Sequence, residues 1–112
     1  MGLRRERLAD EIRDIIASCF QGGQMNDPRL EFVTITAVKL SGDLQIATAY
    51  FRVIGDKLAA EKAQSGLESA AGFLRHKCAE ALDIRRVPTL RFFFDESVER
   101  GARIEDLLTK ID

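Results

Sequence analysis

The first twenty residues alternate apolar and polar positions with the period of an amphipathic helix. Spacings of three and four place the apolar side chains on one helical face: Leu8, Ile12, Ile15, Ile16, Cys19 and Phe20. Gly22-Gly23 ends this helix, and Asn26-Asp27-Pro28 is typical of a turn. The pattern therefore predicts an N-terminal helix followed by a loop.

Three segments are rich in β-branched and aromatic residues and alternate in polarity, as strands do: residues 32–40, 44–53 and 89–94. The expected buried faces are Val33, Ile35 and Ala37; Ala47, Ala49, Phe51 and Val53; and Leu90, Phe92 and Phe94. Arg91 and Phe93 lie on the other face of the third strand. Because only Ser41-Gly42-Asp43 separates the first two strands, they are predicted to form an antiparallel hairpin.

Residues 58–82 predict a long helical region with an interruption. Its buried stripe recurs at helical spacing: Leu67, Ala70, Leu74, Cys78 and Leu82. The small residues Ala70, Ala71 and Gly72 predict a kink within it, since glycine weakens a helix interior. After the third strand, Ser97 is a candidate cap for a last helix, with its apolar side formed by Ile104, Leu107, Leu108 and Ile111.

The predicted order is helix, strand, strand, helix–kink–helix, strand, helix. Three strands with one apolar face each favour a small sheet with the helices packed on one side, which is an α+β fold. A chain of 112 residues fits one domain, residues 1–112, and carries enough apolar residues for a core without metal or disulfide staples.

Charge is distributed unevenly along the chain. The net charge is only −1, whereas nucleic-acid-binding proteins are usually basic. Residues 73–91 nevertheless hold five cations against two carboxylates, a net +3, and residues 95–112 hold three cations against six carboxylates, a net −3. Because binding depends on where charge sits, one basic region is compatible with a polyanionic partner.

The sequence has no constellation of residues that would support catalysis or metal binding. Nothing matches a phosphate-binding glycine loop, and the single histidine, His76, is predicted to be a surface residue. Cys19 and Cys78 are expected to be packed, reduced thiols, which favours a cytoplasmic protein. There is no signal peptide or apolar run long enough to span a membrane, and no cofactor is expected.

The small residues at 70–72 suggest a place where a phosphate backbone could approach. A turn with minimal side chains exposes the main chain, and the first NH groups of the following helix attract an anion. Arg75 and Lys77 come directly after this segment. This pattern is typical of domains of the KH type, in which nucleic acid runs across a glycine-rich turn between two helices. An equally simple reading is that the small residues serve helix packing.

Four strings, in order, resemble the ribosome-binding factor A family. Ala70-Ala71-Gly72-Phe73-Leu74-Arg75 is similar to the family's Ala-x-Gly interhelical kink, which replaces the Gly-x-x-Gly loop of KH domains. The others are Asp27-Pro28-Arg29-Leu30 with Phe32-Val33-Thr34-Ile35-Thr36; Val87-Pro88-Thr89-Leu90-Arg91-Phe92; and residues 95–104. Together they cover nearly the whole chain, roughly residues 3–111.

The resemblance implies a single type II KH-like domain that binds the small (30S) ribosomal subunit and its 16S rRNA. It implies a role in subunit maturation, rRNA processing and growth in the cold, without enzymatic activity or a small-molecule substrate. We further expect a monomer. The residues predicted to contact RNA are small residues at the kink and cations near it or on the first helix: Ala70, Ala71, Gly72, Arg75, Lys77, Arg85, Arg86, Arg91, Arg4, Arg5 and Arg7.

Two alternatives remain open from the sequence. One is a generic KH-type binder of single-stranded RNA. The other is a protein-interaction or small-ligand regulatory module that dimerises through its sheet, using the exposed face that holds Phe93. RNA binding should weaken steeply with salt and an apolar interface should not, so salt dependence separates these alternatives. Arg29 also has a structural interpretation, in which it pairs with Asp27 or with a carbonyl at a strand end to fix the loop.

Overall fold

The computed structural model describes residues 2–21 and 25–96, which form two long helices, a short 3-10 helix and three strands. The elements are α1 (Gly2–Gln21), η1 (Pro28–Leu30), β1 (Val33–Leu40), β2 (Ile46–Val53), α2 (Lys57–Ala81) and β3 (Thr89–Phe94). The strands and α2 begin and end within two residues of their predicted bounds. The expected helix end at Gly22-Gly23 and the last helix after Ser97 lie outside the described residues.

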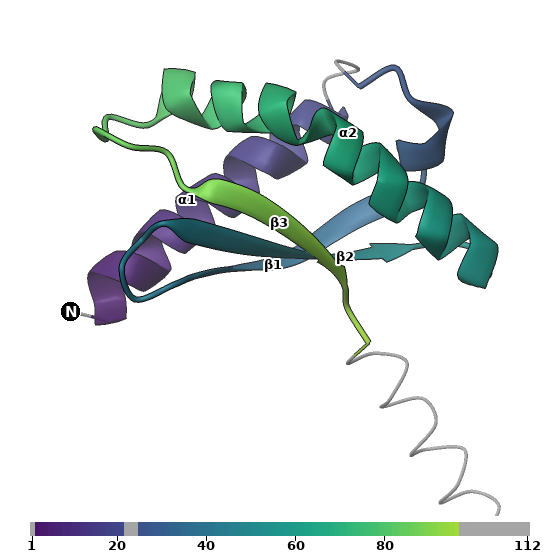
Figure 1. Cartoon of the computed structure of the whole chain (residues 1–112), viewed down its shortest axis with the longest axis horizontal. Coiled ribbons are helices and arrows are strands. Elements are labelled where there is room, and N and C mark those ends of the chain that lie inside the picture. Colours follow the sequence, from purple (N-terminus) through teal and green to yellow (C-terminus); the bar gives the residue numbers. More distant parts are fainter. Residues whose placement is uncertain (1, 22–24, 97–112) are drawn as a thin grey trace, which may run out of the picture.

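The three strands form one mixed sheet with β2 at its centre. β1 pairs with β2 antiparallel, which confirms the predicted hairpin, and β3 joins the other side of β2 in parallel. A parallel neighbour requires a crossover, and α2 supplies it between β2 and β3. Both helices cover the same face of the sheet (Figure 1), so the predicted α+β fold with helices on one side is confirmed.

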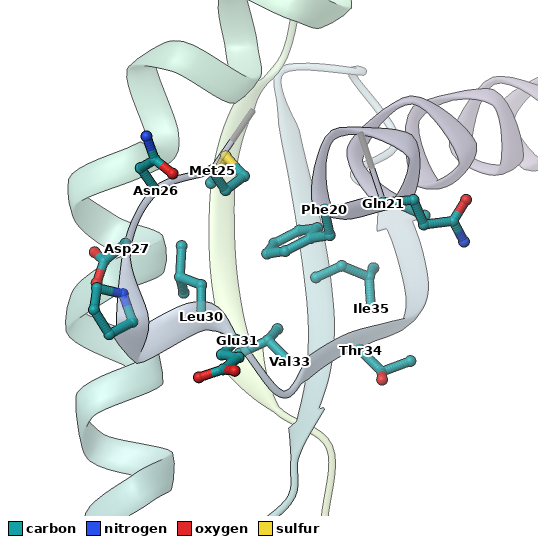
Figure 2. A pocket seen from close by; sticks show the side chains of 12 residues that line it. Phe20, Gln21, Met25, Asn26, Asp27, Leu30, Glu31, Val33, Thr34 and Ile35 are labelled. Carbon is teal, nitrogen blue, oxygen red and sulfur yellow. The ribbon is translucent and has the colours of Figure 1, made fainter. Parts of the chain in front are cut away.

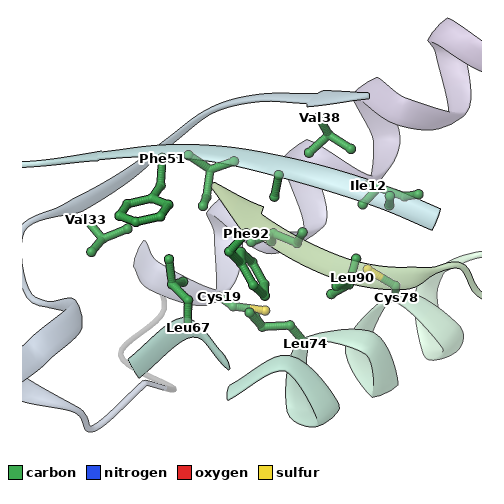
Figure 3. Close-up of a cluster of buried hydrophobic side chains, with 14 of the residues drawn as sticks. Ile12, Cys19, Val33, Val38, Phe51, Leu67, Leu74, Cys78, Leu90 and Phe92 are labelled. Atoms are coloured by element: carbon green, nitrogen blue, oxygen red, sulfur yellow. The ribbon is translucent and has the colours of Figure 1, made fainter. Parts of the chain in front are cut away.

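The buried face of the sheet and the inner sides of the helices enclose one apolar core (Figure 3). Phe51, on the central strand β2, is fully buried, and its ring meets that of Phe94 edge to face at 5.7 Å between centroids. Leu67 and Leu74 from α2 and Ile12 from α1 are also fully buried. The predicted inward faces of both helices, β2 and β3 are therefore confirmed.

One buried face was predicted wrongly, on β1. The pairing register shifts between Ile35 and Ala37, which marks a β-bulge at Thr36. The extra residue reverses the alternation beyond it, so that Val38 and Leu40 are buried while Ala37 and Lys39 turn outward. A pattern read with strict period two cannot anticipate this reversal.

The β1–β2 turn is longer than the predicted three residues. The Asp43 carboxylate accepts hydrogen bonds from the Ser41 hydroxyl (2.7 Å) and the Gln45 amide (3.1 Å). Leu44 adopts a left-handed conformation with φ of 62°. These contacts hold residues 41–45 in the turn, so β2 begins at Ile46 rather than at residue 44.

The kink predicted at Ala70-Ala71-Gly72 is not a turn between two separate helices. These residues are helical, and α2 runs without a break from Lys57 to Ala81. In Figure 1 the ribbon of α2 changes direction near its middle but remains helical. In a continuous helix the backbone NH groups donate to carbonyls four residues earlier. The free NH groups that would attract a phosphate at a second helix start are therefore not formed here.

Two glycines of α2 have opposite surroundings, one buried and one exposed. Gly66 is buried, and a methyl group added there would lie 2.9 Å from Leu30 Cδ2 and 3.3 Å from Arg29 Cβ. The missing side chain thus lets η1 pack directly against the helix. Gly72 is exposed, and an added methyl group would meet no atom within 4 Å.

We expect Gly66→Ala and Gly72→Ala to change stability in opposite directions. At Gly72 alanine gains helix propensity without a clash, which should raise the free energy of unfolding by up to about 1 kcal/mol. At Gly66 the same gain is outweighed by overpacking against Leu30, for a net loss of about 1–2 kcal/mol. Urea unfolding of both variants measures the difference. Equal effects at the two positions would contradict this account of Gly66.

Candidate RNA-binding surface

The fold gathers six of the predicted arginines at one end of the molecule. Two adjoining hollows meet there, between the start of α1, the β1–β2 turn and the loop from α2 to β3. Leu8, Leu44 and Ile84 line both hollows. The arginines lining one or the other are Arg4, Arg5, Arg7, Arg75, Arg85 and Arg86. We call this surface the basic end.

The basic end concentrates positive charge in a chain that is nearly neutral. Its six arginines face only two carboxylates among the lining residues, those of Glu11 and Asp43, for a net charge of +4. Because the whole chain carries −1, the residues outside the basic end sum to a net charge of −5. This uneven distribution of charge gives the basic end a positive electrostatic field that attracts a polyanion, although the overall composition is not that of a basic protein.

Exposed apolar side chains line the same two hollows as the arginines. Leu44 is 41% exposed and Ile84 is 37% exposed. The Arg5 guanidinium approaches the β1–β2 turn, where Nη1 lies 3.7 Å from the position that a Gly42 Cβ would take. Sequence reasoning missed Leu44 and Ile84. Their signal is weak, since each is a single apolar residue next to a turn or loop.

Arg75 also positions the loop that carries Arg85 and Arg86. Its Nε and Nη2 donate to the Val87 carbonyl oxygen at 3.3 and 2.9 Å. A guanidinium has five N–H donors, so donors remain for a ligand after these two bonds. The Asp43 carboxylate is similarly structural, and hydrogen bonds from Ser41 and Gln45 lower the pKa of its carboxyl.

The other predicted RNA-binding residues lie apart from the basic end. Lys77, on α2, is half-buried over the ring of Phe73, with 5.5 Å from Nζ to the centroid, and 3.7 Å from a Glu80 carboxylate oxygen. Arg91 lies on the outward face of β3. Ala70, Ala71 and Gly72 are within α2, and none of them lines either hollow.

The reading of His76 and the cysteines as structural residues agrees with their surroundings. His76 is exposed and lies 2.8 Å from a Glu80 carboxylate oxygen, one helical turn away.

Cys19 and Cys78 are buried free thiols, and burial raises the pKa of Cys78 to about 11. Both thiols therefore stay protonated at neutral pH and pack as small apolar groups. Within residues 2–21 and 25–96, no group of three or more His, Cys, Asp and Glu could hold a metal ion.

A third hollow, between the end of α1 and the loop before β1, contains none of the predicted RNA-binding residues (Figure 2). Phe20, Leu30 and Val33 contribute its apolar wall. At its rim Arg29 donates to Asp27, with Nη2 2.6 Å from Oδ2, and this bond lowers the pKa of the Asp27 carboxyl. The structural reading of Arg29, as a residue that fixes the loop, is confirmed.

No helix within the described part of the chain is long and apolar enough to cross a membrane.

The fold, a three-stranded mixed sheet with two helices on one face, defines the chain as a small KH-like α+β protein. The chain belongs to the ribosome-binding factor A family, whose sequence pattern matches residues 4–108. This membership confirms the family resemblance of the four strings, and it identifies a ribosome-binding factor rather than an enzyme.

Relatives and solved structures agree with this assignment. Ribosome-binding factor A of Pelobacter propionicus is 46% identical over 99% of this chain and 90% of its own length, and that of Heliobacterium modesticaldum is 45% identical over 99% and 91%. The crystal structure of ribosome-binding factor A from Thermus thermophilus is similar with a TM-score of 0.74, at 27% identity over 83% of this chain and 97% of that one. A homology model of T. thermophilus ribosome-binding factor A, fitted into a cryo-electron-microscopy map of its complex with the 30S subunit, is similar with a TM-score of 0.67, at 27% identity over 82% of this chain and 96% of that one.

Proposed function

We propose that this protein binds the 30S ribosomal subunit during its maturation and contacts 16S rRNA through the basic end. The observation that carries the proposal is the convergence of six arginines from three separate segments around one surface. The similarity to a protein fitted in complex with the 30S subunit supports the choice of partner.

The basic end is suited to grip a folded RNA rather than to read a sequence. Arginine guanidinium groups bind phosphates bidentately and release condensed counterions, a contribution that does not depend on base identity. Leu44 and Ile84 add apolar contact area for ribose or base edges between the arginines. Since α1, the β1–β2 turn and the α2–β3 loop must be arranged together, the surface exists only in the folded protein.

The same proposal covers the location, the oligomeric state and the chemistry of the protein. The protein acts in the cytoplasm as a monomer and a single domain, without cofactor or catalysis. Arg75 contributes both a phosphate contact and the position of the α2–β3 loop. Lys77 and the segment 70–72 lie outside the basic end, so in this proposal they are secondary contacts at most.

Co-sedimentation of the purified protein with 30S and 50S subunits, at low and moderate salt, tests the function. We expect binding to 30S subunits that weakens steeply as salt increases, with little binding to 50S subunits. Absence of binding to 30S subunits at either salt concentration would refute the proposal. Binding that is insensitive to salt would refute the role of the arginines and favour an apolar interface.

A further inference from the structure

The outward face of the sheet, opposite the helices, carries two ordered rows of side chains. The strand registers pair Lys39 with Thr48 and Thr48 with Arg91, so one row across the sheet has a cation at each edge. The next row pairs Ala37 with Tyr50 and Tyr50 with Phe93. These residues line one shallow hollow that no other described element covers.

The second row holds two neighbouring aromatic rings, of which that of Phe93 is exposed and that of Tyr50 is partly buried. Phe93 is 51% exposed, and its ring centroid lies 6.5 Å from that of Tyr50, with 39° between the planes. Lys39 Nζ lies 5.7 Å from the centroid of the Tyr50 ring. A cross-strand aromatic pair stabilises a sheet, but stabilisation alone does not require half of a phenylalanine to remain in water.

Small side chains keep this face open. The bulge in β1 turns Ala37 outward beside Tyr50, where the unbroken alternation would have buried it. Thr48 similarly separates the two cations with a short side chain. The aromatic rings and the cations are therefore accessible from above the sheet.

The open face continues directly from the basic end. Thr89, the first residue of β3, lines a hollow of the basic end, and Arg91 follows it by two residues on the same face of the strand. Two residues of a strand span about 6.6 Å. Along β3 the order is thus basic end, cation, aromatic ring and finally the acidic residues Asp95 and Glu96, which bound the hollow at the far end.

We propose that this open face is a second RNA-contact surface, on which unpaired bases of rRNA stack against Tyr50 and Phe93. Lys39 and Arg91 contact the phosphates of the same single-stranded segment, whose path continues to the basic end. The inference rests on the proposed function, because it takes the partner to be rRNA. Exposed aromatic rings on a sheet beside cations are the arrangement by which proteins bind single-stranded nucleic acid.

The composition of the chain provides a direct probe of this face. Tyr50 is the only tyrosine and there is no tryptophan, so intrinsic tyrosine fluorescence reports on the proposed site alone. We expect a 12-nucleotide oligouridylate to quench this fluorescence saturably at low salt, and a duplex RNA of the same length to quench it much less. In Phe93→Thr the apparent dissociation constant should rise about tenfold. Threonine is chosen because it retains strand propensity, and a thermal melt checks that the variant folds.

Phe32→Ala is the matched control. Phe32 is 55% exposed and precedes β1 at the opposite end of the hairpin from the basic end, so quenching should be unchanged. Co-sedimentation of Phe93→Thr with 30S subunits completes the test. Normal 30S binding by the wild type and by Phe93→Thr, with no quenching by the oligonucleotide, would overturn the inference and leave the proposed function intact. Self-association of the wild type that is lost in Phe93→Thr, with RNA binding unchanged, would also overturn the inference. The open face would then be an interface with a second copy of the chain.

Discussion

Replacing Arg85 and Arg86 together by glutamate is expected to lower the affinity for 30S subunits by about 100-fold at about 0.1 M salt. For each phosphate contact the logarithm of the binding constant changes by about 0.7–0.9 per tenfold change in salt. One lost contact therefore costs roughly a factor of ten at 0.1 M salt. Both side chains are exposed and line the basic end, so the substitution removes two contacts and adds two repulsive charges.

The matched control for this variant is Lys57→Glu with Lys62→Glu. These lysines are exposed in the first two turns of α2, about 28–36 Å along the helix from the end that leads to Arg85, and the total change in charge is the same. Co-sedimentation with 30S subunits over a range of salt concentrations measures both variants. In the arginine variant the slope of the logarithm of the binding constant against the logarithm of the salt concentration should also be less steep, by the amount that about two phosphate contacts contribute. An equal loss of affinity in the two variants would mean that net charge, rather than the basic end, controls binding.

Truncation of Phe51 to alanine is expected to lower the free energy of unfolding by about 3–5 kcal/mol. Phe51 is fully buried on the central strand of the sheet and packs edge to face against Phe94. Removing the ring forfeits both its burial and these contacts, and leaves a cavity that the surrounding strands cannot close. For a domain of this size each 1 kcal/mol lowers the melting temperature by about 4–8 °C. We therefore expect the thermal melt to show a loss of at least about 12 °C.

Phe93→Ala makes the same truncation on the outward face. Phe93 is half exposed, and among the described aromatic residues only the tilted ring of Tyr50 lies beside it, so its loss should cost about 1 kcal/mol or less. Urea unfolding of both variants gives the comparison. A loss at Phe93 as large as that at Phe51 would show that the outward face is covered and packed, which would also remove the basis for base stacking there.

The comparison of sequence and structure is most instructive at the segment 70–72. Three small residues before two cations favoured a turn between helices, but Ala70 and Ala71 are good helix formers and Gly72 is merely tolerated at an exposed position. Local composition could not distinguish a helix that bends from two helices that meet at a turn. Hydrogen bonding along α2, supported by burial of Leu67 and Leu74 on either side, decided in favour of one helix.

The sequence by itself determined the elements, their inward faces and the family. Hydrophobic periodicity is a short-range property, and it identified α1, β2, α2 and β3 because each of them buries one continuous face. The exception, Ala37, follows from a bulge, which depends on how β1 pairs with β2 rather than on β1 alone. Family membership followed from short strings in the right order, which do not require knowledge of contacts.

Only the tertiary structure decided which residues act together. Arg4 and Arg86 lie near opposite ends of the described chain, and they share one surface because α1 and the α2–β3 loop meet beside the β1–β2 turn. Strand register likewise sets Tyr50 beside Phe93 and aligns Lys39 with Arg91 across the sheet. A periodic pattern states which side of an element is buried, but it carries no information on which elements meet or in what register. Those relations arise from packing of the whole core, and the two proposed RNA-contact surfaces depend on them.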